Sequence, residues 1–279
     1  MDNILIWGYS VPSTWLSQAE TDYLKGLPQE LPTVEWVWEE MDRVWHELNL
    51  DNRRPFASQN IGDYYGHPVW LMNGIFTALD PVSFSHRIAI SNHLKLLGVK
   101  SIADYGGGFG ELARAMCHAI PDAVVSIVEP YPSRVGLERL RNEPRIRFVS
   151  DLSASGYDAI IAQDVLEHLE DPLFLAYQIA NAVTEEGRLI FANCFYPVIQ
   201  CHLPSTYHFR HTFPWVMESL GLRYLGTVEG ASHALVFKRV GRLNLARARR
   251  AETVSRLFGQ PFNQVHMSLS RIKSLVLRS

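Results

Sequence analysis

Residues 99–116 read VKSIADYGGGFGELARAM, and this stretch decides the fold. An apolar run comes first, then a glycine-rich turn, then a series of helix formers, which predicts strand, tight turn and helix. Gly106, Gly108 and Gly110 alternate after Asp104 as D-x-G-x-G-x-G. Glycine accepts positive φ and lets backbone approach a ligand, so the turn is either a ligand cradle or simply a tight connection. The spacing matches neither the phosphate loop G-x-x-x-x-G-K-[ST] nor the dinucleotide pattern G-x-G-x-x-G.

Polar residues follow the strands that are predicted after this turn. Glu129 closes a β-branched run, and a carboxylate in that place can accept hydrogen bonds from both hydroxyls of a ribose. Asp151 and Leu152 follow a second run, and Gln163 ends a third. Ligands of parallel sheets bind outside the carboxyl ends of the strands. These residues and the glycine turn therefore predict a single ligand site.

The ordered motifs resemble those of the class I S-adenosylmethionine (SAM) methyltransferases. The glycine turn is similar to the first motif of that superfamily, residues 164–172 (DVLEHLEDP) to the segment after its fourth strand, and residues 186–193 to the turn and strand that follow. The resemblance implies that SAM binds here, with Asp151 facing the adenine amino group, and that S-adenosylhomocysteine is the product. The cofactor-binding residues that it implies are Asp104, Gly106, Gly108, Gly110, Glu129, Asp151, Leu152 and Gln163.

Strand and helix signals alternate through the middle of the chain, which predicts an α/β fold with a doubly wound, Rossmann-like sheet. The resemblance implies seven mostly parallel strands with an antiparallel finish. Three regions are expected: an N-terminal helical cap or substrate lid at residues 1–83, a SAM-binding methyltransferase domain at residues 84–240, and a basic helical tail at residues 241–279.

His168 is the candidate catalytic base. The methyl group of SAM is already electrophilic, so the enzyme must align an acceptor atom and, for a hydroxyl, remove a proton. His168 follows the fourth strand, and an ordinary imidazole pKa of ~6.5 would make the rate rise with pH through that range. The alternative is a histidine that merely bonds the loop or caps the next helix. His211 is the candidate second catalytic residue, as a further substrate contact.

A metal ion is the weaker hypothesis for the same segment. Asp164, Glu167 and His168 form a D-x-x-E-H group similar to the E-x-x-E-H ligands of ubiquinone-pathway O-methyltransferases and of small-RNA 3′-end methyltransferases. Two carboxylates and an imidazole suit Mg²⁺ or Mn²⁺, with a fourth ligand from His208 or His211. Asp164 is one methylene shorter than the expected Glu, so a divalent metal is possible but not favoured, and no metal ligand is assigned.

The composition is that of an ordinary globular protein, with 47% hydrophobic and 20% charged residues among 279. The sequence contains no apolar run long enough to span a bilayer and no secretion-signal pattern. Three cysteines without C-x-x-C spacing favour free thiols over a disulfide framework. These observations together predict a cytoplasmic protein.

The charge is distributed unevenly. From Lys238 onward the chain carries ten Lys or Arg against the single acid Glu252, although the net charge of the whole chain is −3. Such a tail can bind an anionic partner, such as phosphate groups or a membrane face, or it can dock on the acidic body of its own protein or a second subunit. A homo-oligomer is therefore possible.

The function expected is SAM-dependent O-methylation of a small-molecule or sugar-containing metabolite. The N-P-P-[YF] signature of amino-group methylation does not occur. One rival is a metal-dependent RNA 3′-end methyltransferase, suggested by D-x-x-E-H and the basic tail. The other is a non-catalytic SAM-fold module that binds SAM or a partner enzyme.

Overall fold

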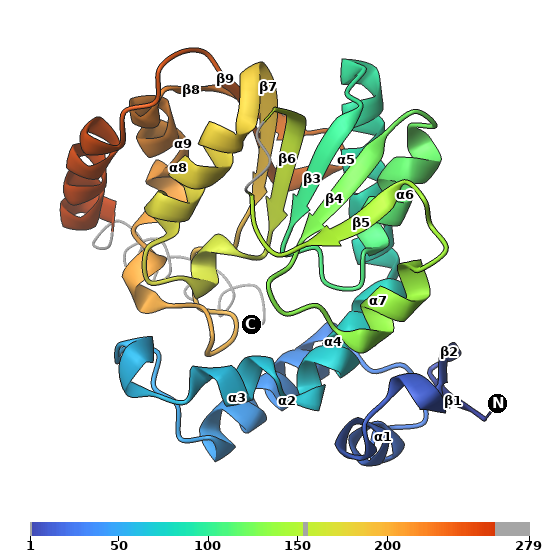
Figure 1. Cartoon of the computed structure of the whole chain (residues 1–279). Helices are drawn as coiled ribbons and strands as arrows, with labels where there is room; N and C mark the ends of the chain where they lie inside the picture. The colour runs from blue at the N-terminus through green and yellow to red at the C-terminus, as the bar shows by residue number, and fades with distance from the viewer. Residues whose placement is uncertain (1, 153–155, 260–279) are drawn as a thin grey trace, which may run out of the picture.

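The computed structural model describes residues 2–152 and 156–259, and its centre is a seven-stranded sheet of order β5-β4-β3-β6-β7-β9-β8 (Figure 1). β5, β4, β3, β6 and β7 are parallel, and β9 is antiparallel to both of its neighbours. The strands are β3 (Ser101–Tyr105), β4 (Val124–Val128), β5 (Ile146–Val149), β6 (Tyr157–Gln163), β7 (Val183–Ala192), β8 (Leu222–Val228) and β9 (Ala231–Arg239). The predicted fold class is confirmed.

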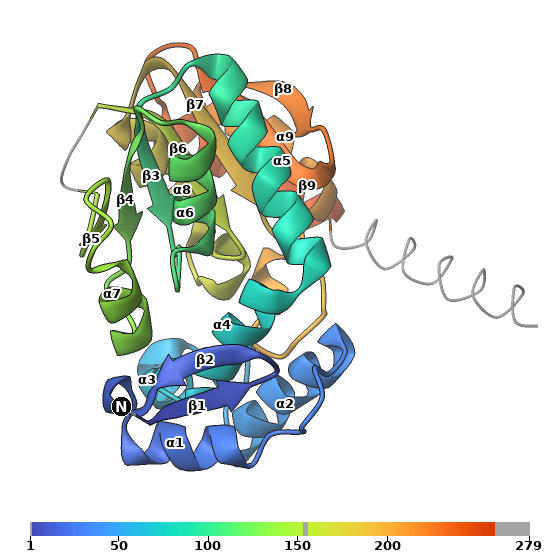
Figure 2. The same cartoon turned by 90° about the vertical axis from the view of Figure 1, so that its right-hand side faces the viewer.

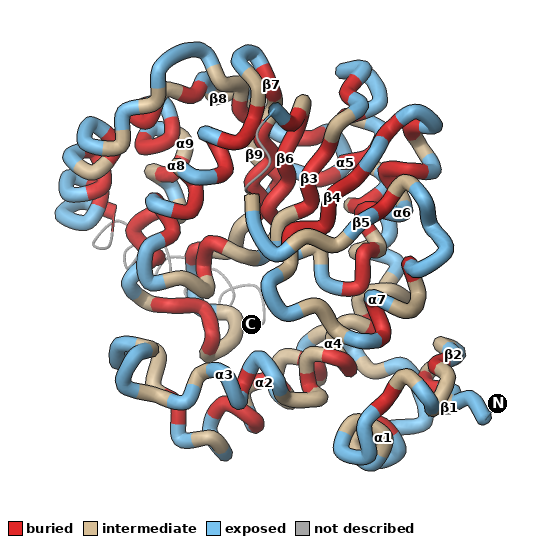
Figure 3. The backbone as a smooth tube through the Cα atoms, in the orientation of Figure 1, coloured by how far each residue is buried: buried red, intermediate tan, exposed pale blue. Residues whose placement is uncertain are grey.

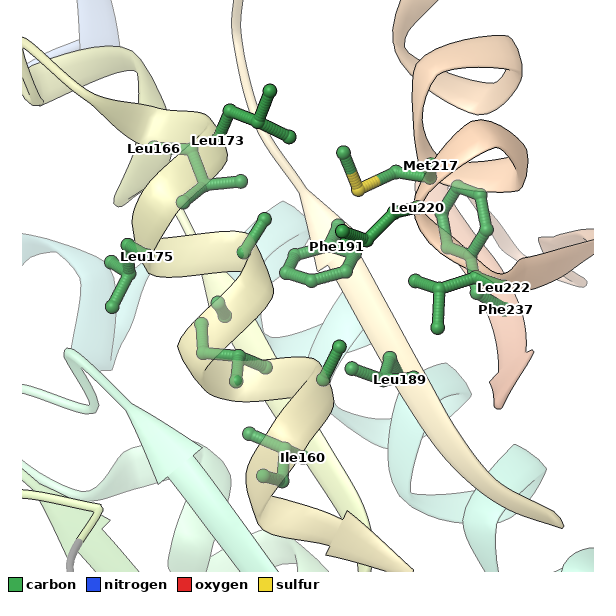
Figure 4. Packing of buried hydrophobic residues seen from close by; sticks show 14 of the residues in the cluster. Ile160, Leu166, Leu173, Leu175, Leu189, Phe191, Met217, Leu220, Leu222 and Phe237 are labelled. Carbon is green, nitrogen blue, oxygen red and sulfur yellow. The ribbon is translucent and has the colours of Figure 1, made fainter. Parts of the chain in front are cut away.

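Helices cover both faces of the sheet, so its strands are buried on both sides (Figures 1 and 3). α5 (Pro81–Leu97) and α6 (Glu111–Ala119) pack on one face. α8 (Pro172–Ala182) and α9 (Phe209–Leu220) pack on the other, where Phe191 and Leu189 of β7 meet both helices (Figure 4). α7 (Arg134–Leu140) joins β4 to β5. Burial on both faces is the arrangement that near-continuous apolar strands require.

The N-terminal region lies beneath the sheet, at the end where the parallel strands stop (Figure 2). Its helices are α1 (Gln18–Lys25), α2 (Val34–Glu47), α3 (Ile61–Tyr65) and α4 (Pro68–Leu79). The expectation of a purely helical cap is wrong in one respect, because β1 (Asn3–Ile6) and β2 (Tyr9–Pro12) form an antiparallel hairpin. The turn residues Trp7 and Gly8 have φ of 53° and 90°. Hairpin turns with positive φ are usually marked by Asn-Gly, Asp-Gly or Gly-Gly, so a Trp-Gly turn is not recognisable from the sequence.

Two other boundaries differ from the sequence pattern. The resemblance implied a turn and strand at residues 186–193, but β7 begins at Val183, and its pairing with β6 contains a register shift between Tyr157 and Ala159. α9 begins at Phe209, so Pro214 lies inside the helix. Proline is tolerated in the first turn of a helix but disfavoured further in, so a helix over Pro214 is not what the sequence pattern indicates.

The basic tail continues as a helix at residues 245–259 and packs beside α8 and α9, with Ala248 and Ala251 in their apolar cluster. The predicted helix is therefore present over this part of the tail. The rest of the predicted tail, residues 260–279, lies outside the described residues. Over the described parts of the chain, no helix has the length and apolar character needed to cross a membrane.

Candidate active site

The glycine turn follows β3, next to the point where the strand order reverses. The chain runs from β3 outward to β4 and β5, and then returns to β6 on the other side of β3. Gly106, Gly108 and Gly110 all have positive φ, at 71°, 52° and 77°. The next helix, α6, starts at Glu111 with Gly110 as its N-cap. Ligands of doubly wound sheets bind at this switch point, so the turn is correctly placed for one.

The three glycines are needed for different reasons. A Cβ at Gly106 would lie 2.6 Å from Val165, and one at Gly110 would lie 2.4 Å from Leu140, so both positions are closed by the protein itself. A Cβ at Gly108 would meet nothing within 4 Å. Of the three, only Gly108 therefore faces open space that a ligand can fill.

Asp104 lies under the turn rather than beside it. Its side chain is buried, and its Oδ2 lies 2.6 Å from the position a Cβ would take at Gly107, a glycine that the motif did not mark. Burial, with a smaller contribution from Glu129, raises the pKa of Asp104 to about 7. Oδ2 has no hydrogen-bond partner within residues 2–152 and 156–259. The carboxyl group thus supports the turn and retains an unsatisfied acceptor.

The other predicted cofactor residues lie along the same edge of the sheet. Glu129, at the end of β4, is half-buried, and burial raises its pKa although the backbone N–H groups of Tyr131 and Gly108 oppose the rise. This places the Glu129 carboxylate next to the glycine turn. Asp151, which is exposed, and the half-buried Leu152 follow β5. The predicted positions therefore follow successive strand ends.

The end of β6 turns sharply into a short 3₁₀ helix, η3 (Leu166–His168). The predicted Gln163 ends β6, and its Nε2 donates to Asp164 Oδ2 at 3.3 Å. Asp164 has φ of 52°, a left-handed conformation that few residues other than glycine adopt. Strained backbone of this kind concentrates at functional sites. The turn directs the next side chains, Glu167 and His168, toward the loop that follows β7.

Glu167 is fully buried behind this turn. Its Oε1 accepts the backbone N–H of Cys194 at 2.7 Å, whereas its Oε2 has no partner in the part of the chain that the structure describes. Burial, reinforced by the charge of Asp164, raises the pKa of Glu167 to about 8. The group is therefore mostly a neutral carboxylic acid at neutral pH.

His168 is half-buried, and its Nδ1 lies 3.1 Å from the carbonyl oxygen of Cys201. That contact places the proton on Nδ1 and leaves the lone pair on Nε2. Burial, with a smaller contribution from His202, lowers the pKa of His168 to about 3. The imidazole is thus neutral throughout the neutral range. The expectation of a titration near the ordinary value is wrong, because the ring is enclosed by protein.

The structure brings His202 to His168, which the sequence did not predict. The two ring centroids are 5.0 Å apart, and Nδ1 of His202 lies 3.2 Å from the carbonyl oxygen of Tyr196. Glu167, His168 and His202 each offer one potential ligand atom, and these atoms lie within 4.8 Å of one another. Among the described residues this is the group that could hold a metal ion, and it contains His202 where His208 or His211 was expected.

The two other predicted histidines lie elsewhere. His208 is fully buried, with Nε2 3.8 Å from Glu252 of the tail helix. His211 is exposed in the first turn of α9. The catalytic role expected for His211 stays a prediction. No local pattern marks His202, since it comes from a loop whose composition is rich in His, Tyr and Cys but whose spacing is irregular.

Aromatic side chains from the cap and the core lie near this group. The rings of Tyr65 and Trp70 lie 5.2 Å apart, and Trp70 meets His168 edge to face at 6.2 Å. Tyr196 is 39% exposed, with the Arg210 guanidinium 4.5 Å from its ring centre. Tyr65 is 40% exposed, yet burial raises its pKa. The cap thus contributes Tyr65 and Trp70 to the aromatic side chains beside His168.

A second pair of histidines reaches Asp164 through His86. The rings of His86, on α5, and His233, on β9, lie 4.4 Å apart. His86 lies close enough to Asp164 to oppose the rise that burial causes in the pKa of that carboxyl. Neither histidine belongs to a motif, and only the fold brings them together.

The fold and this edge of the sheet define a class I methyltransferase. A family model described as "Methyltransferase domain" matches residues 83–224, which is more than half of the chain. The chain belongs to this methyltransferase family and is a SAM-dependent methyltransferase.

The individual proteins that the chain resembles share only a small fraction of its residues. An uncharacterized methyltransferase of Mycobacterium bovis is 25% identical over 150 residues, covering 52% of this chain and 73% of that protein. A ubiquinone biosynthesis O-methyltransferase of Xanthomonas euvesicatoria is 27% identical over 125 residues, covering 41% and 50%. The structure of an O-methyltransferase family protein from Burkholderia thailandensis has a TM-score of 0.52 at 13% identity, covering 81% of this chain and 77% of that one. At that identity the structural likeness supports the fold alone.

Proposed function

We propose that this protein transfers a methyl group from SAM to a hydroxyl oxygen of a small-molecule or sugar-containing metabolite, held between the cap and the carboxyl ends of β6 and β7. The observation that carries the proposal is the neutral, oriented imidazole of His168, which lies edge to face with Trp70 of the cap. A relative from Xanthomonas is described as an O-methyltransferase, which supports the choice of oxygen.

The glycine turn and its neighbours fit SAM. The open space beside Gly108 admits a ligand against backbone, and the Glu129 carboxylate next to it can accept hydrogen bonds from ribose hydroxyls. When bound, SAM supplies an electrophilic methyl group. Asp151 and Leu152, at the end of β5, would then lie on the adenine side, and Gln163 on the side of the reacting centre.

His168 is suited to take the proton of an acceptor hydroxyl. Its Nδ1–H is held by the Cys201 carbonyl, so Nε2 is the nitrogen that can accept. A neutral carboxylic acid at Glu167 adds no negative charge that would stabilise a protonated His168, so this imidazole contributes its orientation more than its basicity. General base catalysis contributes typically about 10²–10⁴-fold, and positioning the acceptor contributes more.

The test is His168→Ala, assayed with labelled SAM and a panel of phenols, sugars and other hydroxylated compounds. Turnover should fall by about 10²–10³-fold while SAM affinity changes little, because a base acts in the transition state. Because the lowered pKa leaves Nε2 unprotonated above about pH 3, kcat/KM of the wild type should be flat between pH 6 and 7.

Two results would remove His168 from the mechanism. One is equal turnover of wild type and His168→Ala on every acceptor that reacts. The other is a rate that rises tenfold per pH unit below pH 7 in both proteins, which would place the essential base elsewhere. Methyl transfer only to amines would overturn the choice of oxygen.

A further inference from the structure

The loop between β7 and α9, residues 193–208, carries the groups that orient the candidate base, and the cap holds its first half. The backbone N–H of Gln200 donates to Asp42 Oδ1 at 2.6 Å, and Asn52 Nδ2 donates to the carbonyl of Gln200 at 2.8 Å. The neighbouring carbonyl, that of Cys201, is the one that faces His168 Nδ1. We call residues 193–208 the acceptor loop.

The C-terminal helix holds the second half of the acceptor loop. Arg256 Nη1 donates to the carbonyl of Ser205 at 3.1 Å, and Ser255 Oγ donates to the carbonyl of His208 at 3.2 Å. At Gly259 a Cβ would lie only 2.5 Å from the same His208 carbonyl, so the helix backbone lies directly on the loop. Two consecutive turns of the helix therefore contact the loop.

The helix itself is firmly attached to the core. Glu252 is 4% exposed and pairs with Arg249 Nη1 at 2.9 Å and Arg256 Nη2 at 2.8 Å. Arg249 also pairs with Asp171, at the start of α8. Arg249 and Arg256, two of the basic residues of the tail, therefore form ion pairs within the chain. A buried carboxylate with two guanidinium partners fixes the rotation of the helix on the core, so its contacts with the loop are fixed too.

A short path leads from these contacts to the candidate base. Tyr207 Oη donates to the carbonyl of His202 at 3.0 Å, and the backbone N–H of Leu203 donates to the carbonyl of Glu167 at 2.9 Å. Between residues 201 and 205, hydrogen bonds therefore connect the acceptor loop both internally and to η3. A shift of the loop at Ser205 would move the Cys201 carbonyl, and with it the ring of His168.

We propose that the C-terminal helix, residues 245–259, is a positioning element of the acceptor site, acting through Ser255 and Arg256 on the acceptor loop. The inference rests on the proposed function, in that the acceptor binds beside His168. Misplacement of a catalytic group by about 1 Å can cost roughly 100-fold in rate. The glycine turn and Glu129 lie at other strands, so cofactor binding does not depend on this contact.

The test compares full-length variants of neighbouring helix residues. The double variant Ser255→Ala, Arg256→Ala removes both side-chain contacts, while Glu252 keeps Arg249 as a partner. Arg256→Lys restores one donor. Arg250→Ala, an exposed position on the same helix, is the matched control for the loss of charge. Each protein is assayed for kcat, acceptor KM, SAM affinity and melting temperature.

The double variant should lose about tenfold or more in kcat on the acceptor, with SAM affinity within twofold of wild type. Arg256→Lys should recover part of the loss, and Arg250→Ala should match wild type. Wild-type kcat and KM in a folded double variant would overturn the proposal. A parallel loss of SAM affinity would also overturn it, because it would mean general destabilisation.

A second measurement needs no acceptor, so it separates this proposal from the proposed function. In imidazole ¹H–¹⁵N spectra of ¹⁵N-labelled protein, the His168 Nδ1–H signal should shift or broaden in the double variant, since its Cys201 partner is no longer held. The signal of His118, exposed on α6, should not change. Unchanged His168 signals would refute the positioning role even if no acceptor is ever found.

Discussion

The two halves of the proposed active site are built in opposite ways. The cofactor half comes from short segments at successive strand ends, and its central part is the seven consecutive residues from Asp104 to Gly110. The acceptor half is assembled from the cap, the turn after β6, the acceptor loop and the C-terminal helix, which lie more than 200 positions apart in the chain. The cofactor half therefore depends on local backbone conformation, and the acceptor half on tertiary contacts.

The largest effect expected from this contrast is at the glycine turn. Gly108→Val should weaken SAM binding by 100-fold or more, measured by calorimetry, because the side chain would fill the open space and the residue must keep φ of 52°. The protein should still fold, since a Cβ there meets nothing within 4 Å.

Gly110→Val is the matched comparison. Here the Cβ would lie 2.4 Å from Leu140, so the substitution should lower the melting temperature as well as SAM affinity. If both variants unfold, or both bind SAM normally, the distinction between a ligand-facing and a packing glycine is wrong.

The same contrast explains what the sequence predicted. The glycine turn and the residues at strand ends were found in their expected places because periodicity and turn chemistry act over a few residues. The helix from Pro81 to Leu97 has equally local signals at its ends, because Asp80 accepts the Ser83 N–H at 2.7 Å and Gly98 ends the helix at φ of 67°.

The partners in the acceptor half carry no such local signal. His202 reaches His168 only because the loop folds back over η3, and its 34-residue separation from His168 follows no motif. The pKa of His168 was likewise set by enclosure, which a sequence does not display. Even within the glycine turn, sequence spacing could not tell the open position Gly108 from the packed position Gly110.

A smaller effect should separate structural from ligand contacts inside the cofactor half. Burial raises the pKa of Asp104 in the folded protein from the ordinary value of 3.8 to about 7. The contribution of Asp104 to the free energy of unfolding is therefore fully present below the pKa of the unfolded chain, and it is lost as pH rises through about 7. Asp104→Asn stays neutral at every pH. The melting temperature of Asp104→Asn relative to wild type should therefore rise by roughly 5 °C between pH 5 and pH 8.

The difference between the two pH values cancels the constant cost of placing an amide there. A relative melting temperature that is independent of pH would show that Asp104 titrates normally and is not enclosed by the turn. SAM affinity at pH 5, where the wild-type carboxyl is also neutral, should be similar in the two proteins if Asp104 acts mainly by supporting the turn.

The smallest effect is expected from metal removal, which tests how the acceptor half works. Glu167, His168 and His202 supply only one carboxylate, whereas Mg²⁺ prefers oxygen ligands, so EDTA should change turnover by less than about twofold. Loss of activity in EDTA with recovery in Mn²⁺ would contradict this.

His168 would then act as a ligand through Nε2 rather than as a base, and His202→Ala should abolish metal binding measured by calorimetry. The pH profile would then report metal-assisted ionisation of the acceptor, and the two halves would differ in chemistry as well as in construction.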